Sequence, residues 1–307
     1  MTRPAVIALL LMTPLVCAAA GRVRSLEVRI LSTMLADDDG FGEWGFAALV
    51  IADGHRILFD TGAHPDTVLR NARELKIDLS SVPDVILSHH HIDHTAGLIT
   101  LRREYPNALS RAHVGKGIFF AREQGKMAAI KADYEATGAS FVQYDQPREL
   151  FPGVWLTGPV PRKYPERNWG GQSKMRGEDG KTVQDNLPED QSLIIDTDNG
   201  LVLISGCGHA GVINTIDYAT ATIRRAPVHA AIGGFHLFAA SDETLAWTAG
   251  KLKEFGLQNF LGAHCTGIEA VYRIRELTGL DRKTAVVGAV GAGFKLGTGI
   301  QPGSIAR

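Results

Sequence analysis

The chain has 307 residues, of which 45% are hydrophobic and 21% charged, and its formal net charge is −1. This composition is ordinary for a globular protein with one large core or two small ones. The nearly neutral charge and the absence of long basic runs give no electrostatic reason to expect nucleic acid or an anionic membrane as a partner.

Residues 1–20 have the pattern of a secretory signal peptide. Arg3 supplies a positive charge, residues 5–16 are apolar, and small residues precede Gly21. The apolar stretch is short for a membrane span and contains Pro14, although a retained anchor is the alternative. We therefore expect an exported protein, periplasmic or secreted, with no membrane span in its mature chain.

The first half of the mature chain is predicted to contain a hairpin and an amphipathic helix. Residues 47–51 and 56–59 form two β-type runs joined through Asp53 and Gly54. Residues 65–75 carry apolar side chains at helical spacing. Two further elements complete this half: a strand at residues 85–87 and a helix at residues 98–105.

The second half begins with another predicted hairpin, formed by residues 192–196 and 201–205. The later elements are predicted in the order helix 212–224, strand 230–233, helix 242–255, strand 260–262, helix 268–277 and strand 284–287. Two sheets flanked by helices follow from this order. The glycine-rich tail, residues 288–307, is expected to end in irregular structure.

The halves are separated by residues 159–189, a polar segment without apolar periodicity, which is expected to be a loop. A loop of this length in a compact enzyme is usually functional or disordered. Five of its side chains are candidates to cover a site and contact an acidic or aromatic substrate: Lys163, Arg167, Trp169, Lys174 and Arg176. The alternative is a solvent-exposed loop that does not contact the substrate.

The most informative segment is SHHHIDHTAG, residues 88–97, directly after a predicted strand. Because alternate side chains of an extended chain point the same way, His89 and His91 face one side together. Asp93 and His94 follow where the chain turns. Neutral imidazole suits transition metals, and a carboxylate beside imidazoles can hold a second ion. The spacing therefore predicts a metal site rather than a histidine-rich surface loop.

With residues 58–62, LFDTG, this segment resembles the metallo-β-lactamase fold superfamily. Three later motifs resemble one subgroup of its metal-dependent hydrolases, some members of which are labelled dihydropterin ribofuranosyl-aminobenzene phosphate synthase: SGCGHAG at 205–211, IGGFHL at 232–237 and AHCTG at 263–267. The resemblance implies an α/β fold, a four-layer αββα sandwich with metals at one edge. We expect residues 21–307 to form this single domain.

The resemblance also suggests metal ligands in the second half. His264 matches the last metal histidine of the superfamily, and Cys207 falls where a bridging aspartate is usual. A thiolate can bind metal there, although a small buried cysteine is the alternative. The superfamily's metal histidine before residue 192 is missing: only His113 lies in that interval, and its position suits a pocket wall. Either His209 or Asp190 is therefore expected to complete the first metal site.

Other side chains are expected to support these ligands. By analogy with superfamily hydrolases, His236 is a candidate to protonate a leaving group or to orient water. The alternative is a hydrogen-bonded histidine that lies behind the ligands. Asp60 is expected to accept a hydrogen bond from a ligand histidine or from loop backbone. Cys207 and Cys265 lie inside the metal motifs, so both a thiol role and a disulfide stay open. Four histidines are expected to be surface or structural residues: His55, His64, His90 and His229.

These features predict an enzyme, a metal-dependent hydrolase that acts on a small molecule. One or two divalent ions, Zn²⁺ foremost with Fe or Mn as alternatives, would generate a metal-bound hydroxide that attacks an ester, lactone, amide or phosphoester. Asp93 would help to hold the second ion and position that hydroxide. The alternatives are an iron-dependent oxidoreductase on the same scaffold and a non-catalytic exported ligand-binding protein. The pattern determines neither the substrate nor the oligomeric state.

Overall fold

The structure is a computed structural model that describes residues 21–306, except for residues 39, 124, 167 and 169–171. The predicted signal peptide, residues 1–20, lies outside the described residues. Within the described part of the chain, no helix combines the length and apolar character that a membrane crossing requires.

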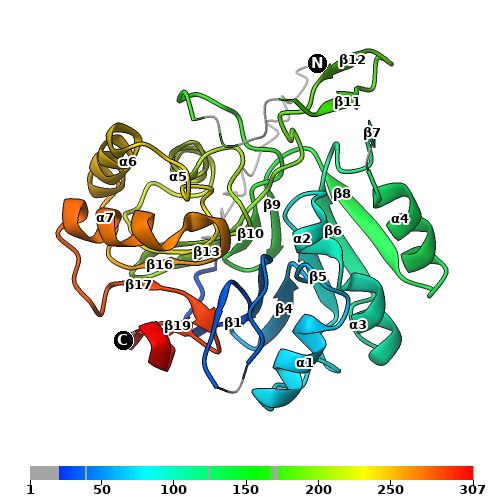
Figure 1. Cartoon of the computed structure of the whole chain (residues 1–307), viewed down its shortest axis with the longest axis horizontal. Helices are drawn as coiled ribbons and strands as arrows, with labels where there is room; N and C mark the ends of the chain where they lie inside the picture. Colours follow the sequence, from blue (N-terminus) through cyan, green and yellow to red (C-terminus); the bar gives the residue numbers. More distant parts are fainter. Residues whose placement is uncertain (1–20, 39, 124, 167, 169–171, 307) are drawn as a thin grey trace, which may run out of the picture.

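Two β-sheets form the centre of the molecule (Figure 1). The strands of the first are β1 (Leu26–Ser32), β3 (Ala47–Ala52), β4 (His55–Phe59), β5 (Asp84–Leu87), β6 (Arg111–Gly115), β8 (Ser140–Tyr144), β19 (Gly293–Lys295) and β20 (Gly299–Gln301). Their order in the sheet is β20-β19-β1-β3-β4-β5-β6-β8. The strands of the second are β9 (Arg148–Phe151), β10 (Val154–Leu156), β13 (Leu193–Thr197), β14 (Gly200–Ser205), β15 (Val228–Gly233), β16 (Phe260–Gly262) and β17 (Ala285–Val287). Their order is β17-β16-β15-β14-β13-β10-β9.

Helices cover the outer face of each sheet (Figure 1). The first sheet is accompanied by α1 (Thr67–Glu74), α2 (Ile92–Thr95), α3 (Leu98–Glu104) and α4 (Met127–Glu135). The second is accompanied by α5 (Val212–Thr222), α6 (Asp242–Glu254) and α7 (Ile268–Thr278). The shorter elements are β2 (Leu35–Ala36), β7 (Ala121–Arg122), β11 (Lys174–Arg176), β12 (Thr182–Gln184), η1 (His264–Thr266), β18 (Ala289–Val290) and η2 (Ser304–Ala306).

The alternation of side chains along the strands explains the four layers. In β14, Val202 and Ile204 enter the core between the two sheets, whereas Leu201 and Leu203 enter the core under α5 and α6. In β4, Phe59 faces the inner core and Leu58 the helix side. Both faces of these strands are therefore apolar and buried, as an αββα sandwich requires. The predicted fold class is confirmed.

The two predicted hairpins are confirmed, since β3 pairs antiparallel with β4 and β13 with β14. The prediction for residues 288–307 was wrong. Phe294 is fully buried in the inner core, and β19 pairs with β1 so that Lys295 lies opposite Glu27. The tail therefore extends the first sheet. Residues 159–189 also contain more than a loop, because β11 pairs with β12 and β7 in a three-stranded sheet.

Candidate metal centre

The candidate donors lie just beyond the carboxyl ends of parallel strands. The strands β4 and β5 run parallel in the first sheet, and β14, β15 and β16 do so in the second. The chain leaves these strands into the segments that carry Asp60, His89, Cys207, His236 and His264, in that order. Because parallel strands share one end, the two sheets bring distant segments to a common edge.

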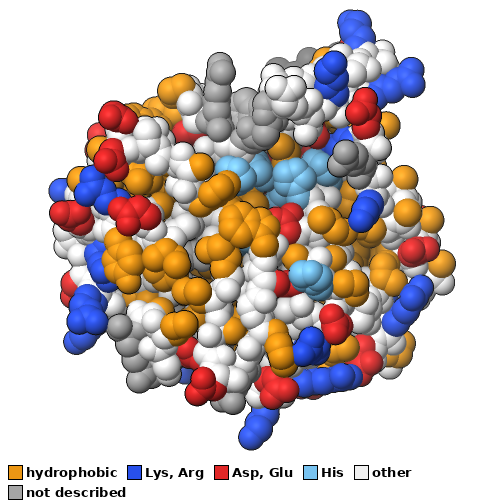
Figure 2. Space-filling view, viewed as in Figure 1, with side chains coloured by type: hydrophobic (Ala, Val, Ile, Leu, Met, Phe, Trp, Pro, Cys, Tyr) orange, Lys and Arg blue, Asp and Glu red, His pale blue; other side chains and the backbone are white. Residues whose placement is uncertain are grey.

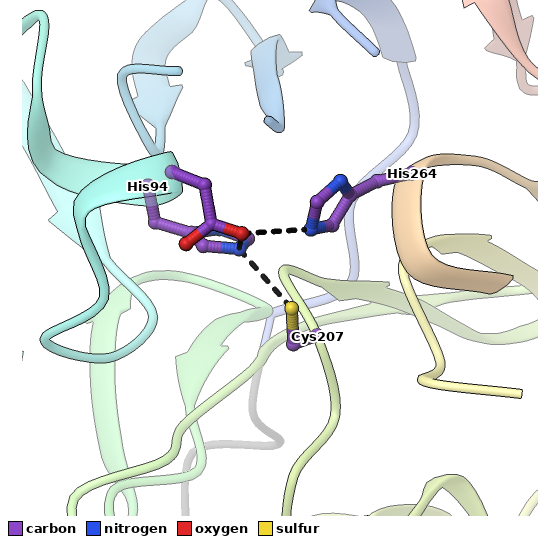
Figure 3. A group of neighbouring side chains, drawn as sticks. His94, Cys207 and His264 are labelled. Atoms are coloured by element: carbon purple, nitrogen blue, oxygen red, sulfur yellow. Dashed lines mark hydrogen bonds and ion pairs between the residues drawn. The ribbon is translucent and has the colours of Figure 1, made fainter. Parts of the chain in front are cut away.

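One group of four donors joins both halves of the chain (Figure 3). It consists of Asp93, His94, Cys207 and His264, whose donor atoms all lie within 4.8 Å of one another. The distance from His94 Nε2 to Cys207 Sγ is 3.1 Å, and His264 Nε2 lies 3.3 Å from Asp93 Oδ2. All but Asp93 are buried.

A second group contains His89, Cys207 and His209, again within 4.8 Å of one another. His89 Nε2 lies 3.2 Å from His209 Nε2 and 3.0 Å from His91 Nδ1. Cys207 belongs to both groups, so its sulfur lies between them. The geometry thus offers two neighbouring ion positions that share a thiol.

Hydrogen bonds orient the histidine rings toward these positions. His94 donates from Nδ1 to Asp60 Oδ2 at 2.7 Å, and His89 Nδ1 lies 2.9 Å from Ser88 Oγ. His209 donates from Nδ1 to the carbonyl oxygen of Asn168. With Nδ1 protonated in this way, each ring presents an Nε2 lone pair to the shared space, which is how metal-binding histidines are usually held.

The ring of His264 differs from those of the other donor histidines. Neither ring nitrogen of His264 forms a hydrogen bond within the described residues. Burial holds the pKa values of His89 and His209 well below the usual range and lowers the pKa of His91 to about 3, so these rings are neutral. Burial also raises the pKa of the Cys207 thiol and so favours its protonated form. A bound cation beside the sulfur would favour the thiolate instead. Imidazoles, a thiol and a carboxylate together fit a divalent ion such as zinc.

Asp60 is fully buried behind the histidines. Besides the bond from His94, it accepts hydrogen bonds from Ser88 N at 2.7 Å and from Ser88 Oγ at 2.8 Å. Gly206 packs directly against this pair: a Cβ there would come within 2.5 Å of Asp60 Oδ2 and 2.2 Å of Ser88 Oγ. Only glycine therefore fits beside the carboxylate.

Of the two alternatives for the missing histidine, His209 reaches the donors and Asp190 does not belong to either group. Asp190 is buried and accepts a hydrogen bond from Ala210 N at 2.8 Å, so it supports the turn that carries His209. Burial raises the pKa of its carboxyl to about 7. His113, whose position suggested a pocket wall, lies within β6 and bonds to Asp84 and Tyr144 at 2.9 Å each, and it belongs to neither donor group.

His236 lies beside the donors, with its ring centroid 4.7 Å from that of His209. Its Nδ1 is buried without a hydrogen-bond partner among the described residues. The Sγ atoms of Cys207 and Cys265 lie 3.3 Å apart, and both cysteines are free thiols in this structure. His90 points to Glu189, with its Nδ1 at 2.6 Å from the carboxylate, and so away from the donors.

The remaining histidines are structural or exposed. His64 lies 2.8 Å from Glu43, His229 lies 2.8 Å from Gln258, and His55 stacks on Phe151.

The long segment before β13 contributes residues that the sequence did not single out. Asn168 bonds to His209 and to the carbonyl oxygen of Gly208. Glu166 accepts hydrogen bonds from the first amides of α5, including Asn214 N at 2.8 Å. Lys163 instead pairs with Asp217 at the surface. Two predicted covering residues, Arg167 and Trp169, lie outside the described residues, and Lys174 and Arg176 are exposed on β11.

The chain is similar to several known proteins. Residues 45–223 match the family model described as the Metallo-beta-lactamase superfamily. A relative from Methanocaldococcus jannaschii, named 7,8-dihydropterin-6-methyl-4-(beta-D-ribofuranosyl)-aminobenzene-5'-phosphate synthase, is 32% identical over 269 residues, which cover 81% of this chain and 90% of the relative.

Solved structures of metallo-beta-lactamase proteins are also similar to this chain. One described as a metal-dependent hydrolase of the beta-lactamase superfamily has 26% identity and a TM-score of 0.70, and the match covers 89% of this chain and 99% of that one. The metallo-beta-lactamase fold protein YhfI from Bacillus subtilis has 14% identity and a TM-score of 0.54, over 88% of this chain and 98% of that one, and so supports the fold alone.

Proposed function

Because this chain belongs to the metallo-β-lactamase superfamily, a superfamily of enzymes, we propose that it is a metal-dependent hydrolase with two divalent ions, most simply zinc. The first position would be held by His89, His91 and His209. The second would be held by Asp93, His94 and His264, with Cys207 shared between the two positions.

The observation that carries this proposal is the shared sulfur of Cys207. A single soft donor that belongs to both groups would put the two ion positions side by side, as two-metal hydrolytic sites require. When bound, such ions lower the pKa of water and neutralise negative charge that develops on a substrate. The chain itself supplies imidazoles whose Nδ1 positions are fixed by Asp60, Ser88 and Asn168.

Two side chains have further proposed roles. Asp93 is the least buried donor of the second group and would help to orient the attacking water, since its carboxylate borders the solvent side. Its pKa lies below the usual range because, although burial opposes it, His94 and His264 favour the ionised form. His236 would donate a proton to the leaving group, because its ring lies 4.7 Å from that of the donor His209 and also lines the cavity beside the donors.

The synthase name of the archaeal relative makes transfer to an acceptor other than water the second candidate reaction. The same donors would polarise the bond to be broken in either reaction, so the test must distinguish the acceptor. A panel of esters, lactones, amides and phosphoesters assayed with water as the only acceptor answers this directly. Turnover there supports hydrolysis, and turnover only with an added nucleophile supports transfer.

The metal requirement is tested on the same panel. We expect the chelated protein to lose activity and Zn²⁺ to restore it. Asp93→Ala should abolish activity, whereas replacing the exposed Asp66 at the N-terminus of α1, as Asp66→Ala, should leave it unchanged. Activity that survives metal removal would refute the proposal. Stoichiometric iron with a visible chromophore would favour oxidoreductase chemistry, and ligand binding without turnover on the whole panel would favour a binding protein.

We further propose export, supported by the sequence pattern of residues 1–20. Expression of the full chain with fractionation and N-terminal sequencing tests this. A mature protein in the periplasm or medium that begins near Gly21 is expected, and an intact N-terminus in the cytosol would contradict it.

A further inference from the structure

Beside the candidate metal centre lies a cavity of about 670 Å³, lined on one side by Pro165, Glu166 and Asn168 and on the other by residues between His236 and Thr248. We propose that this cavity binds a flat, uncharged aromatic group of the substrate. This inference rests on the proposed function, since it assigns a substrate class to the same site.

The wall of the cavity is mainly apolar. The side chains that give it this character are Leu237, Phe238, Ala239, Ala240 and Trp247. Two of them are large aromatic rings from different elements, because Phe238 follows β15 and Trp247 lies in α6. Pockets that bind organic ligands usually combine such apolar walls with a few polar groups at one end.

One end of the cavity adjoins the candidate metal centre through two polar residues. His236 and Asn168 line the cavity, and both contact the donor His209: His236 by its ring at 4.7 Å between centroids, and Asn168 by its carbonyl oxygen. A ligand whose apolar part lies against Phe238 would therefore place its reactive bond near the ions. The cavity thus adjoins the donors through His236 and Asn168.

Two aromatic side chains beside the donors are exposed to an unusual degree. Phe238 is 51% exposed and Trp44 is 48% exposed, and their rings meet edge to face at 5.5 Å. Trp44 also lies 5.1 Å from the ring of His264, and Phe238 lies 5.3 Å from the ring of His236. Figure 2 shows histidine side chains grouped on one face with hydrophobic side chains next to them. Large rings left open beside polar donors favour a ligand-binding role over core packing.

Hydrogen bonds hold the main chain that carries the exposed ring of Phe238. Its amide donates to the carbonyl oxygen of Cys265 at 3.2 Å, and the amide of Leu237 donates to the same oxygen at 3.0 Å. Gly267 packs so closely that a Cβ there would lie 2.7 Å from Phe238 Cα. The ring is thus presented by a rigid segment, which lowers the entropy lost when a ligand binds against it.

The charges on the described part of the wall favour an uncharged ligand. The lining residues with ionisable acidic side chains are Glu166 and Glu243, and the described lining contains no lysine or arginine. The exposed carboxylate of Glu243 would repel an anionic group, whereas an uncharged aromatic ring meets apolar surface. Edge-to-face and offset stacking with Phe238 and Trp247 would add to the free energy of burial.

Binding of small probes to the full-length protein with its metal, measured by calorimetry, tests the proposal without turnover. The probes are 2-naphthamide, its fully saturated decahydro analogue and naphthalene-2-sulfonate. We expect 2-naphthamide to bind most tightly and Phe238→Ala to weaken its binding by about tenfold. The matched control is Phe41→Ala, which removes a 39% exposed phenylalanine outside this cavity and should leave the affinity unchanged.

Equal binding to wild type and to Phe238→Ala, or no binding of 2-naphthamide, would overturn the proposal. A hydrolysis assay separates this failure from failure of the proposed function. Methyl 3-phenylpropanoate should have a lower KM than methyl butanoate, and Phe238→Ala should remove this difference while kcat changes little. Hydrolysis without aromatic preference would refute the cavity assignment alone, whereas Phe238-dependent probe binding without any hydrolysis would refute the hydrolase alone.

Discussion

The replacement Asp60→Asn tests whether the carboxylate behind His94 tunes a metal ligand. Asp60 accepts three hydrogen bonds of 2.7 to 2.8 Å, from Ser88 N, Ser88 Oγ and His94 Nδ1. Asparagine has a single acceptor oxygen, so its amide NH₂ would face at least one of these donors. Leaving a buried donor unpaired costs about 1 to 3 kcal/mol of folding free energy.

The larger effect is expected on metal binding. Loss of a carboxylate partner behind a ligand histidine typically weakens metal affinity by about 10- to 100-fold, which corresponds to about 1.4 to 2.7 kcal/mol. Competition with a chromophoric chelator measures this affinity, and urea unfolding of the metal-free protein measures stability separately.

Asp84→Asn is the matched control. Asp84 is also fully buried and also holds a histidine, since it bonds to His113 at 2.9 Å and to Arg111 at 2.7 Å, but neither partner is a metal-donor candidate. This variant should lose stability and keep the metal affinity of the wild type. Equal metal affinity in Asp60→Asn and wild type, or an equal loss in both variants, would refute the reasoning.

Three further predictions concern pH, oxidation and the C-terminal strands. Burial raises the pKa of Glu166 from its ordinary 4.5 to about 7, so the folded protein holds this proton more tightly than the unfolded chain. The stability that this proton gives is fully present below pH 4.5 and is lost as the pH rises toward 7. In urea unfolding, the free energy of unfolding of wild type should fall by about 3 kcal/mol relative to Glu166→Gln across this window. Parallel pH dependences of the two proteins would contradict this prediction. Hydrogen peroxide should convert the two thiols, 3.3 Å apart, to a Cys207–Cys265 disulfide and two waters, and the loss of the Cys207 donor should release metal. Thiol titration together with a metal-release assay checks this. The variant Cys265→Ser should keep its metal under peroxide, and metal release equal to that of wild type would show that the disulfide is not the cause. Phe294→Ala should reduce the free energy of unfolding by about 3 to 5 kcal/mol because Phe294 is fully buried between the sheets; a loss below 1 kcal/mol would mean that the tail does not complete the core.

Local patterns were sufficient to predict the elements that carry the donors. The spacing of His89, His91, Asp93 and His94 depends only on the end of one strand and the turn after it, and the structure brings these side chains together. Apolar runs likewise predicted β14, because both of its faces are buried in cores.

Features that depend on contacts distant in sequence could not be predicted in this way. The choice between His209 and Asp190 follows from the turn at Gly208, which has a φ of +61°, and from the contact of Asn168 with His209. The glycine-rich tail forms strands only because β1 offers an edge for pairing. Short polar strands such as β11 carry no apolar alternation, so only their pairing with β12 identifies them.

The central claim is that the two donor groups bind two ions and share Cys207, and metal-to-protein stoichiometry tests it most directly. Elemental analysis of purified wild type should give about two ions per chain, His89→Ala and His264→Ala should each retain about one, and Cys207→Ala should lose affinity for both. Metal-free wild type that stays metal-free after incubation with Zn²⁺, or unchanged stoichiometry in folded Cys207→Ala, would contradict the account.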